Sequence, residues 1–104
     1  MDYLPLFVEL KERPVLLVGG GHVAARKALL LLRAGARLRV IAPQLCDELH
    51  LAYQQEKIEW VSAKYQSEHL LGMILVIVAT DDSVLNQQVY LDAQARHIFV
   101  NVVD

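Results

Sequence analysis

Apolar residues gather in short runs along this chain, and segments with helical spacing separate the runs. Residues 15–18, VLLV, form one such run between a proline and a glycine, which predicts a strand buried on both faces. Helical spacing then extends over residues 22–34, and Gly35 is placed to end that helix in a left-handed conformation. Residues 38–42, LRVIA, predict a second strand. The opening pattern is therefore strand, glycine turn, helix, strand.

The second half of the chain repeats this alternation. The expected elements are a helix through Leu45, Leu49 and Ala52, a strand at 58–61, a short turn at 67–71, a strand at 73–79, a helix at 84–95 and a strand at 98–103. Strands that alternate with helices imply right-handed crossovers and a parallel sheet. We therefore expect one α/β domain over residues 1–104, with a Rossmann-like parallel five-stranded sheet in the order 3-2-1-4-5 and helices on both faces. Residues 3–10 are expected to be extended along a sheet edge.

The glycine turn has the spacing of a dinucleotide fingerprint, Gly19-x-Gly21-x-x-Ala24. Gly19 permits the tight turn, Gly21 lets a pyrophosphate approach the backbone, and Ala24 lets the helix pack closely on the strand. The unpaired N–H groups at the helix start favour an anion. Because the motif follows a strand and opens a helix, cofactor binding is favoured over a turn that needs glycine only for steric reasons.

The second strand ends without the acid that usually holds a ribose. In dinucleotide-binding folds an Asp or Glu at this point accepts hydrogen bonds from the ribose hydroxyls. Here Ala42, Pro43 and Gln44 offer only backbone groups and one side-chain amide. NAD remains feasible, and no arginine directly follows the strand to mark the extra phosphate of NADP. The stretch alone leaves the choice between NAD and NADP open.

Polar residues follow the fourth and fifth expected strands. Ligands of parallel sheets lie outside the carboxyl ends of the strands, so Thr80 is a candidate cofactor contact through its hydroxyl or backbone. Asp81 and Asp82 are better placed to cap the next helix, and Asn86 to make a structural hydrogen bond. Asp104 ends the fifth strand at the same edge. Its position fits equally a proton-accepting carboxylate and a cap on a following segment.

Composition narrows the classes of partner. A net charge of −2 gives no general attraction for nucleic acid or for an anionic membrane. The hydrophobic fraction of 55% fits a buried sheet, or apolar surface that another segment covers. No stretch resembles a signal peptide or a membrane span, so we expect a cytoplasmic protein.

Metal-binding patterns are absent from the sequence. Its four histidines are scattered, and no HExxH or CxxC spacing occurs. Cys46 is the only cysteine, which excludes an internal disulfide and fits a reducing compartment. We expect Cys46 to be an ordinary half-buried residue without a histidine or a second cysteine beside it, and we expect no metal site.

Taken together, these motifs resemble the N-terminal domain of the siroheme synthase family. The resemblance covers nearly the whole chain and is carried by LPLF, RPVLLVGGGHVAARKALLLLRAGARLRVIAP, VATDDSVLNQQV and FVNVVD. It implies NAD as the cofactor, with contacts at His22, Val23, Pro43 and Gln44. It also implies that Asp104, the aspartate of the closing NVVD, is the general base.

The resemblance further implies a reaction. The family module is a precorrin-2 dehydrogenase and sirohydrochlorin ferrochelatase, which would oxidise precorrin-2 to sirohydrochlorin with NAD and insert Fe²⁺ as a substrate to give siroheme. Family members are homodimers, and the enterobacterial type is fused to a methyltransferase. They continue past the aspartate that corresponds to Asp104, so we expect this chain to be a fragment with little or no turnover of its own.

Two other functions compete with this one. A regulatory NAD-sensing domain, such as those that gate potassium transporters, shares the strand, glycine turn and helix but usually keeps the acid after the second strand. Ala42 and Asp104 favour the enzyme over that class. A nucleotide-binding scaffold without tetrapyrrole chemistry also fits the residues, and substrate-dependent NADH formation by the longer protein would distinguish it.

Overall fold

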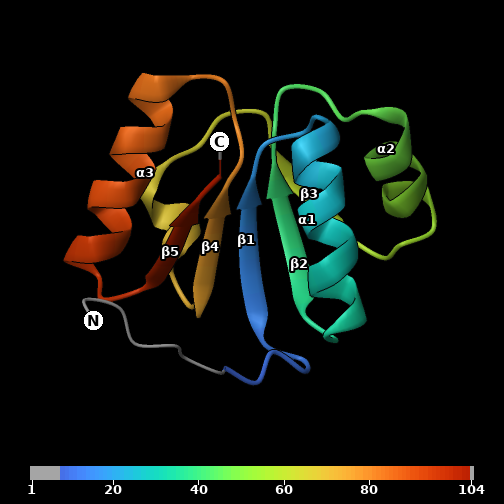
Figure 1. Cartoon of the computed structure of the whole chain (residues 1–104), viewed down its shortest axis with the longest axis horizontal. Helices are drawn as coiled ribbons and strands as arrows, with labels where there is room; N and C mark the ends of the chain where they lie inside the picture. Colours follow the sequence, from blue (N-terminus) through green and yellow to red (C-terminus); the bar gives the residue numbers. More distant parts are fainter. Residues whose placement is uncertain (1–7, 104) are drawn as a thin grey trace, which may run out of the picture.

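The computed structural model describes residues 8–103 and arranges five strands in one sheet. The strands are β1 (Pro14–Val18), β2 (Arg37–Ile41), β3 (Glu59–Ser62), β4 (Leu75–Val78) and β5 (Phe99–Val102). Their order is β3-β2-β1-β4-β5, and each neighbouring pair is parallel (Figure 1). The expected Rossmann-like fold and strand order are confirmed.

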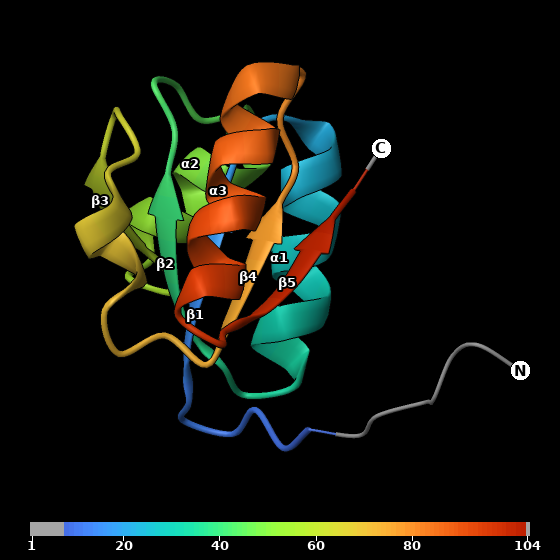
Figure 2. The same ribbon diagram turned by 90° about the vertical axis from the view of Figure 1, so that its left-hand side faces the viewer.

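Helices cover both faces of the sheet. They are α1 (His22–Arg33), α2 (Asp47–Gln54), the short 3₁₀ helix η1 (Ser67–Leu70) and α3 (Ser83–Ala95). In Figure 2, α1 and the η1 segment lie on opposite sides of the strands. Gly35 follows α1 with a φ of 83°, the left-handed conformation predicted for it.

The expected edge segment at residues 3–10 is described only in part. Residues 3–7 lie outside the described residues, and Val8–Leu10 form no strand. The strands at the two edges of the sheet are β3 and β5.

Strand β1 is buried from both sides, which explains its unbroken run of apolar residues. Val15 and Leu17 pack with residues of α1 and α2, whereas Leu16 and Val18 pack with residues of η1 and α3. All four are at most 1% exposed. Successive side chains of a strand point to opposite faces, so a central strand of a covered sheet needs apolar residues at every position.

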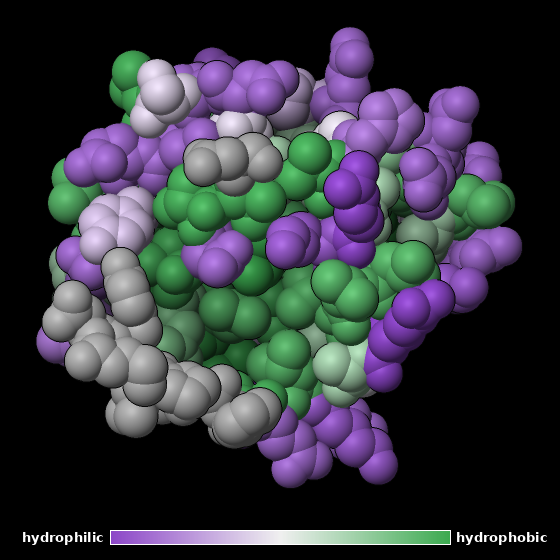
Figure 3. Space-filling model, in the orientation of Figure 1, coloured by the Kyte–Doolittle hydropathy of each residue, from purple (hydrophilic) through white to green (hydrophobic). Residues whose placement is uncertain are grey.

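Some large apolar side chains lie on the surface. Leu29 and Leu30 of α1 and Phe99 of the edge strand β5 are each about half exposed. Figure 3 shows green, apolar surface across the middle of one face of the molecule. None of the helices in residues 8–103 is both long and apolar enough to cross a membrane.

The start of α3 is fixed by one carboxylate. Asp82 Oδ1 accepts hydrogen bonds from the backbone N–H groups of Val84 and Leu85, both at 3.1 Å. Helix starts leave such N–H groups without partners inside the helix, and an N-cap side chain satisfies them. The predicted cap is therefore confirmed for Asp82. It is wrong for Asp81, which precedes the N-cap position and lines a cavity instead.

Replacement of the N-cap should destabilise the fold measurably. We expect Asp82→Ala to lower the free energy of unfolding by about 1 kcal/mol, because two N–H groups lose their acceptor. Asp81→Ala, one position earlier, is the matched control and should change it by less than about 0.5 kcal/mol. Urea denaturation followed by circular dichroism measures both. Equal losses in the two variants would contradict the assignment of the cap.

Candidate cofactor site

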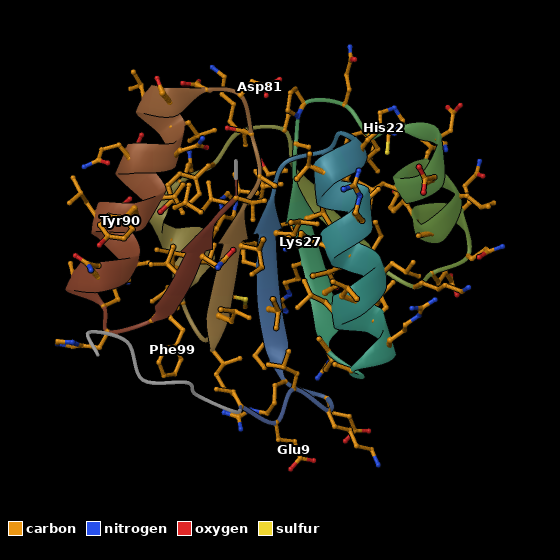
Figure 4. The ribbon with its side chains drawn as sticks, in the orientation of Figure 1. Glu9, His22, Lys27, Asp81, Tyr90 and Phe99 are labelled. Carbon is orange, nitrogen blue, oxygen red and sulfur yellow. The ribbon has the colours of Figure 1, made fainter. Side chains whose placement is uncertain are left out.

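The loops that follow β1, β2 and β4 meet at one edge of the sheet. The strands are parallel, so their carboxyl ends all lie at this edge. Figure 4 shows His22 and Asp81 at the end of the molecule towards which the strands point, and Glu9 at the opposite end. Chain segments that are far apart in the sequence therefore form one candidate site.

Backbone hydrogen bonds hold the glycine turn between its neighbours. The Gly19 N–H donates to the Ile41 carbonyl at 2.9 Å, at the end of β2. The Cys46 N–H donates to the Gly20 carbonyl at 2.7 Å, from the loop before α2. The turn is thus fixed by main-chain groups, whatever side chains surround it.

Two glycines are required by this packing. Gly19 has a φ of 138°, and a Cβ there would lie 2.9 Å from the Ala79 carbonyl carbon. A Cβ on Gly20 would overlap the Gln44 carbonyl oxygen and lie 2.8 Å from the Ala42 Cβ. The role of Gly19 in the tight turn is confirmed. Sequence reasoning gave Gly20 no role, although three consecutive glycines were a visible signal.

Gly21 differs from its neighbours because it faces open space. A Cβ on Gly21 would meet no atom within 4 Å. Gly21 is the N-cap of α1 and offers no side-chain hydrogen bond to the first turn. The helix start therefore presents free N–H groups and its positive dipole end beside an open volume, which is the arrangement that binds phosphate groups. These residues fit the pyrophosphate of a dinucleotide.

A cavity of about 570 Å³ lies over this helix start. It is lined by residues 19–23, 43–46 and 79–81. The lining includes seven of the residues predicted to bind cofactor: Gly19, Gly21, His22, Val23, Pro43, Gln44 and Thr80. Ala24 does not line it, because its side chain is fully buried against the glycine turn, as its predicted packing role requires.

A second cavity of about 400 Å³ adjoins the first and shares Gly19, Pro43 and Thr80 with it. It extends towards Lys64 and Tyr65, which sequence reasoning did not single out. The Tyr65 hydroxyl donates to Asp92 Oδ2 at 2.8 Å. Burial, and then this hydrogen bond, raise the pKa of Tyr65 far above its ordinary value, so the hydroxyl stays neutral and keeps its proton.

The Thr80 loop is tied to α3 by a reciprocal pair of hydrogen bonds. The Thr80 hydroxyl donates to Asn86 Oδ1 at 2.5 Å, and Asn86 Nδ2 donates to the Thr80 carbonyl at 2.9 Å. The structural hydrogen bond predicted for Asn86 is therefore confirmed. The Thr80 hydroxyl is already used within the fold, so its contact with a cofactor stays a prediction.

Cys46 lies near a histidine in space, contrary to the expectation from sequence. His22, Cys46 and Glu48 each offer one ligand atom, and these atoms all lie within 4.8 Å of one another. His22 Nδ1 is 3.5 Å from Glu48 Oε1. The fold brings together the starts of α1 and α2, which no local spacing rule could reveal.

Asp104 lies outside the described residues. The residue before it, Val103, donates its N–H to the Val78 carbonyl at 2.8 Å. The described chain therefore runs beside the end of β4 up to this point, at the carboxyl edge of the sheet. The role of Asp104 as a proton acceptor stays a prediction.

Comparison with known proteins assigns the family. The model of an NAD(P)-binding family, NAD_binding_7, matches residues 6–104. The chain belongs to this NAD(P)-binding family. The glycine turn and the residues that line the cavity above it all fall within the matched range.

Proteins of similar sequence and structure support this family assignment. The chain is 64% identical over 104 residues to the siroheme synthase of Photorhabdus laumondii and 51% identical to that of Zymomonas mobilis. These matches cover all of this chain but only 22% of each relative. A solved structure described as SirC, precorrin-2 dehydrogenase, matches with a TM-score of 0.85 and 30% identity, over 95% of this chain and 48% of that one.

The contact at Gly20 of this NAD(P)-binding domain predicts a large effect of one methyl group. We expect Gly20→Ala to lower the free energy of unfolding by about 2–3 kcal/mol, because the added Cβ overlaps backbone atoms that side-chain rotation cannot move. Gly21→Ala is the matched control, with open space at the Cβ position, and should cost below about 1 kcal/mol. Urea denaturation compares them. A smaller loss for Gly20→Ala than for Gly21→Ala would contradict the packing argument.

Proposed function

We propose that this chain is the NAD-binding domain of a longer enzyme of siroheme biosynthesis. That enzyme oxidises precorrin-2 to sirohydrochlorin with NAD and inserts Fe²⁺, as a substrate, to give siroheme. The observation that carries the proposal is the full-chain match, at 64% identity, to a protein named siroheme synthase. A structural neighbour named as a precorrin-2 dehydrogenase supports the same chemistry.

The cofactor is proposed to lie along the carboxyl edge of the sheet. Its pyrophosphate would rest on the start of α1, where Gly21 leaves open space and where His22 and Val23 begin the helix. Pro43 and Gln44 would contact the ribose. Among the residues that the structure describes, those that line the larger cavity include no lysine or arginine, which favours NAD over NADP because a 2′-phosphate is usually held by a cation.

The oxidation of precorrin-2 needs one acceptor for a hydride and another for a proton. Bound NAD supplies the acceptor for the hydride that leaves precorrin-2. A second group must take the accompanying proton, and the insertion of Fe²⁺ releases further protons from pyrrole nitrogens. We assign this role to Asp104, because the family resemblance implies it and because the described chain reaches the carboxyl edge of the sheet at Val103.

The longer protein is proposed to be a cytoplasmic homodimer that binds neither nucleic acid nor membranes. For the part of that protein given by this chain, the net charge of −2 supports the absence of a nucleic-acid or anionic membrane partner. Phe99 and Val102 on the edge strand β5 are 50% and 41% exposed, and they support a contact there with a further chain segment. Because the chain spans 22% of these relatives, we propose that it forms one domain, residues 1–104, and turns over little substrate alone.

Charge placed at Gly21 should block the cofactor. We expect Gly21→Asp to weaken NAD binding at least 10-fold, on the order of 1.4 kcal/mol or more, because the carboxylate would occupy the pyrophosphate position and repel it. Gln88→Asp adds the same charge at an exposed position of α3, outside both cavities, and is the control. Isothermal titration calorimetry with NAD and NADP measures affinity and cofactor preference. Unchanged NAD affinity in Gly21→Asp would defeat the assignment.

Loss of the proposed base should lower the rates of both reactions and leave the affinity for NAD unchanged. In the longer protein, we expect Asp104→Ala to lower dehydrogenation and iron insertion by roughly 10²–10⁴, the usual range for a lost general base. NAD affinity should remain similar, since the aspartate accepts protons and does not hold the pyrophosphate. NADH formation from precorrin-2 and the absorbance of siroheme report the two rates. Wild-type rates in this variant would remove Asp104 from the mechanism.

A further inference from the structure

Three metal-binding side chains of different chemistry meet where α1 and α2 begin. His22 is the first residue of α1, Cys46 is the N-cap of α2, and Glu48 lies in the first turn of α2. Their nitrogen, sulfur and oxygen atoms lie within 4.8 Å of one another. Neither the family assignment nor the proposed reaction uses Cys46 or Glu48.

The separation between His22 and Glu48 suits a tetrahedral ion better than it suits a hydrogen bond. His22 Nδ1 and Glu48 Oε1 are 3.5 Å apart, which is long for an N–H···O hydrogen bond. Zinc holds nitrogen and oxygen ligands at about 2.1 Å, so two such ligands at the tetrahedral angle lie about 3.4 Å apart. His22 and Glu48 are largely exposed, with 82% and 73% of their side-chain surfaces accessible, so small rotations can close the remaining distances.

The backbone beneath these side chains is held in place. The Cys46 N–H donates to the Gly20 carbonyl at 2.7 Å, and its own carbonyl accepts from the His50 N–H at 2.8 Å. The start of α2 is therefore tied to the turn that leads into His22. The Cys46 thiol has only a weak contact, a hydrogen bond of 3.6 Å to the Gly21 carbonyl, which a metal ion would replace.

We propose that His22, Cys46 and Glu48 bind a divalent cation of the zinc class at the rim of the larger cavity. A thiolate and an imidazole select Zn²⁺ or Co²⁺ over the hard ions Mg²⁺ and Ca²⁺. The thiolate and the carboxylate together neutralise the ion, whose charge would otherwise be unfavourable beside the positive ends of two helices. Three protein ligands leave the fourth tetrahedral position open. His22 and Cys46 line the cavity, so the ion would lie at its pyrophosphate end.

Alkylation of the cysteine tests the site directly, because Cys46 is the only cysteine in the chain. We expect saturating Zn²⁺ to slow the reaction of Cys46 with iodoacetamide at least about 10-fold in the wild-type chain. Glu48→Gln and His22→Asn should each raise the Zn²⁺ concentration for half-protection by at least about 10-fold, the lower range for disturbed metal sites. Asp47→Asn, in the same helical turn, is the matched control and should leave it unchanged.

Cobalt gives an independent readout that needs no alkylation. Co²⁺ should bind the wild-type chain with 1:1 stoichiometry and produce a thiolate-to-cobalt charge-transfer band, which Cys46→Ser abolishes. Circular dichroism confirms that each variant is folded. An alkylation rate that does not respond to Zn²⁺ would overturn the proposal. So would protection with the same midpoint in Glu48→Gln and His22→Asn as in wild type. NAD binding and tetrapyrrole turnover are measured separately, so neither outcome depends on the proposed function.

Discussion

Close contact between main-chain atoms of three loops governs the geometry of this domain. Gly20 lies so near the Gln44 carbonyl, and Gly19 so near that of Ala79, that neither position has room for a Cβ. Hydrogen bonds from Gly19 to Ile41 and from Cys46 to Gly20 fix the same arrangement. Close-packed backbone cannot relax as a flexible side chain can. The carboxyl edge of the sheet is consequently assembled in advance of any ligand.

This constraint leaves one glycine free for binding. Of the three consecutive glycines, Gly19 and Gly20 are required for close packing, and Gly21 faces open space at the uncapped start of α1. The helix N–H groups can therefore meet an anion without competition from a capping side chain. The same packing also brings the start of α2 to the start of α1, which places Cys46 and Glu48 beside His22. The proposed dinucleotide site and the proposed cation site thus share one structural cause.

The sequence predicts the features of this molecule that depend on local pattern. The buried run at β1, the left-handed Gly35 and the cap at Asp82 follow from the properties of neighbouring residues, and all three are confirmed. Sequence patterns did not predict the contacts between residues that are far apart in the chain. The Tyr65 bond to Asp92 spans 27 residues, and Cys46 meets a histidine from another helix, because tertiary packing alone decides such pairs. No periodicity or spacing rule contains that information.

Amide chemical shifts in a ¹⁵N-labelled sample of the chain would locate NAD most directly. We expect added NAD to change the chemical shifts of the backbone amides of residues 20–24 and 80–81 most strongly, since these residues surround the larger cavity and the start of α1. The chemical shifts of amides at the amino ends of the strands, at residues 35–36 and 56–57, should not change. Changes concentrated at these amino ends, or spread evenly over the domain, would contradict the placement of the cofactor on the glycine turn.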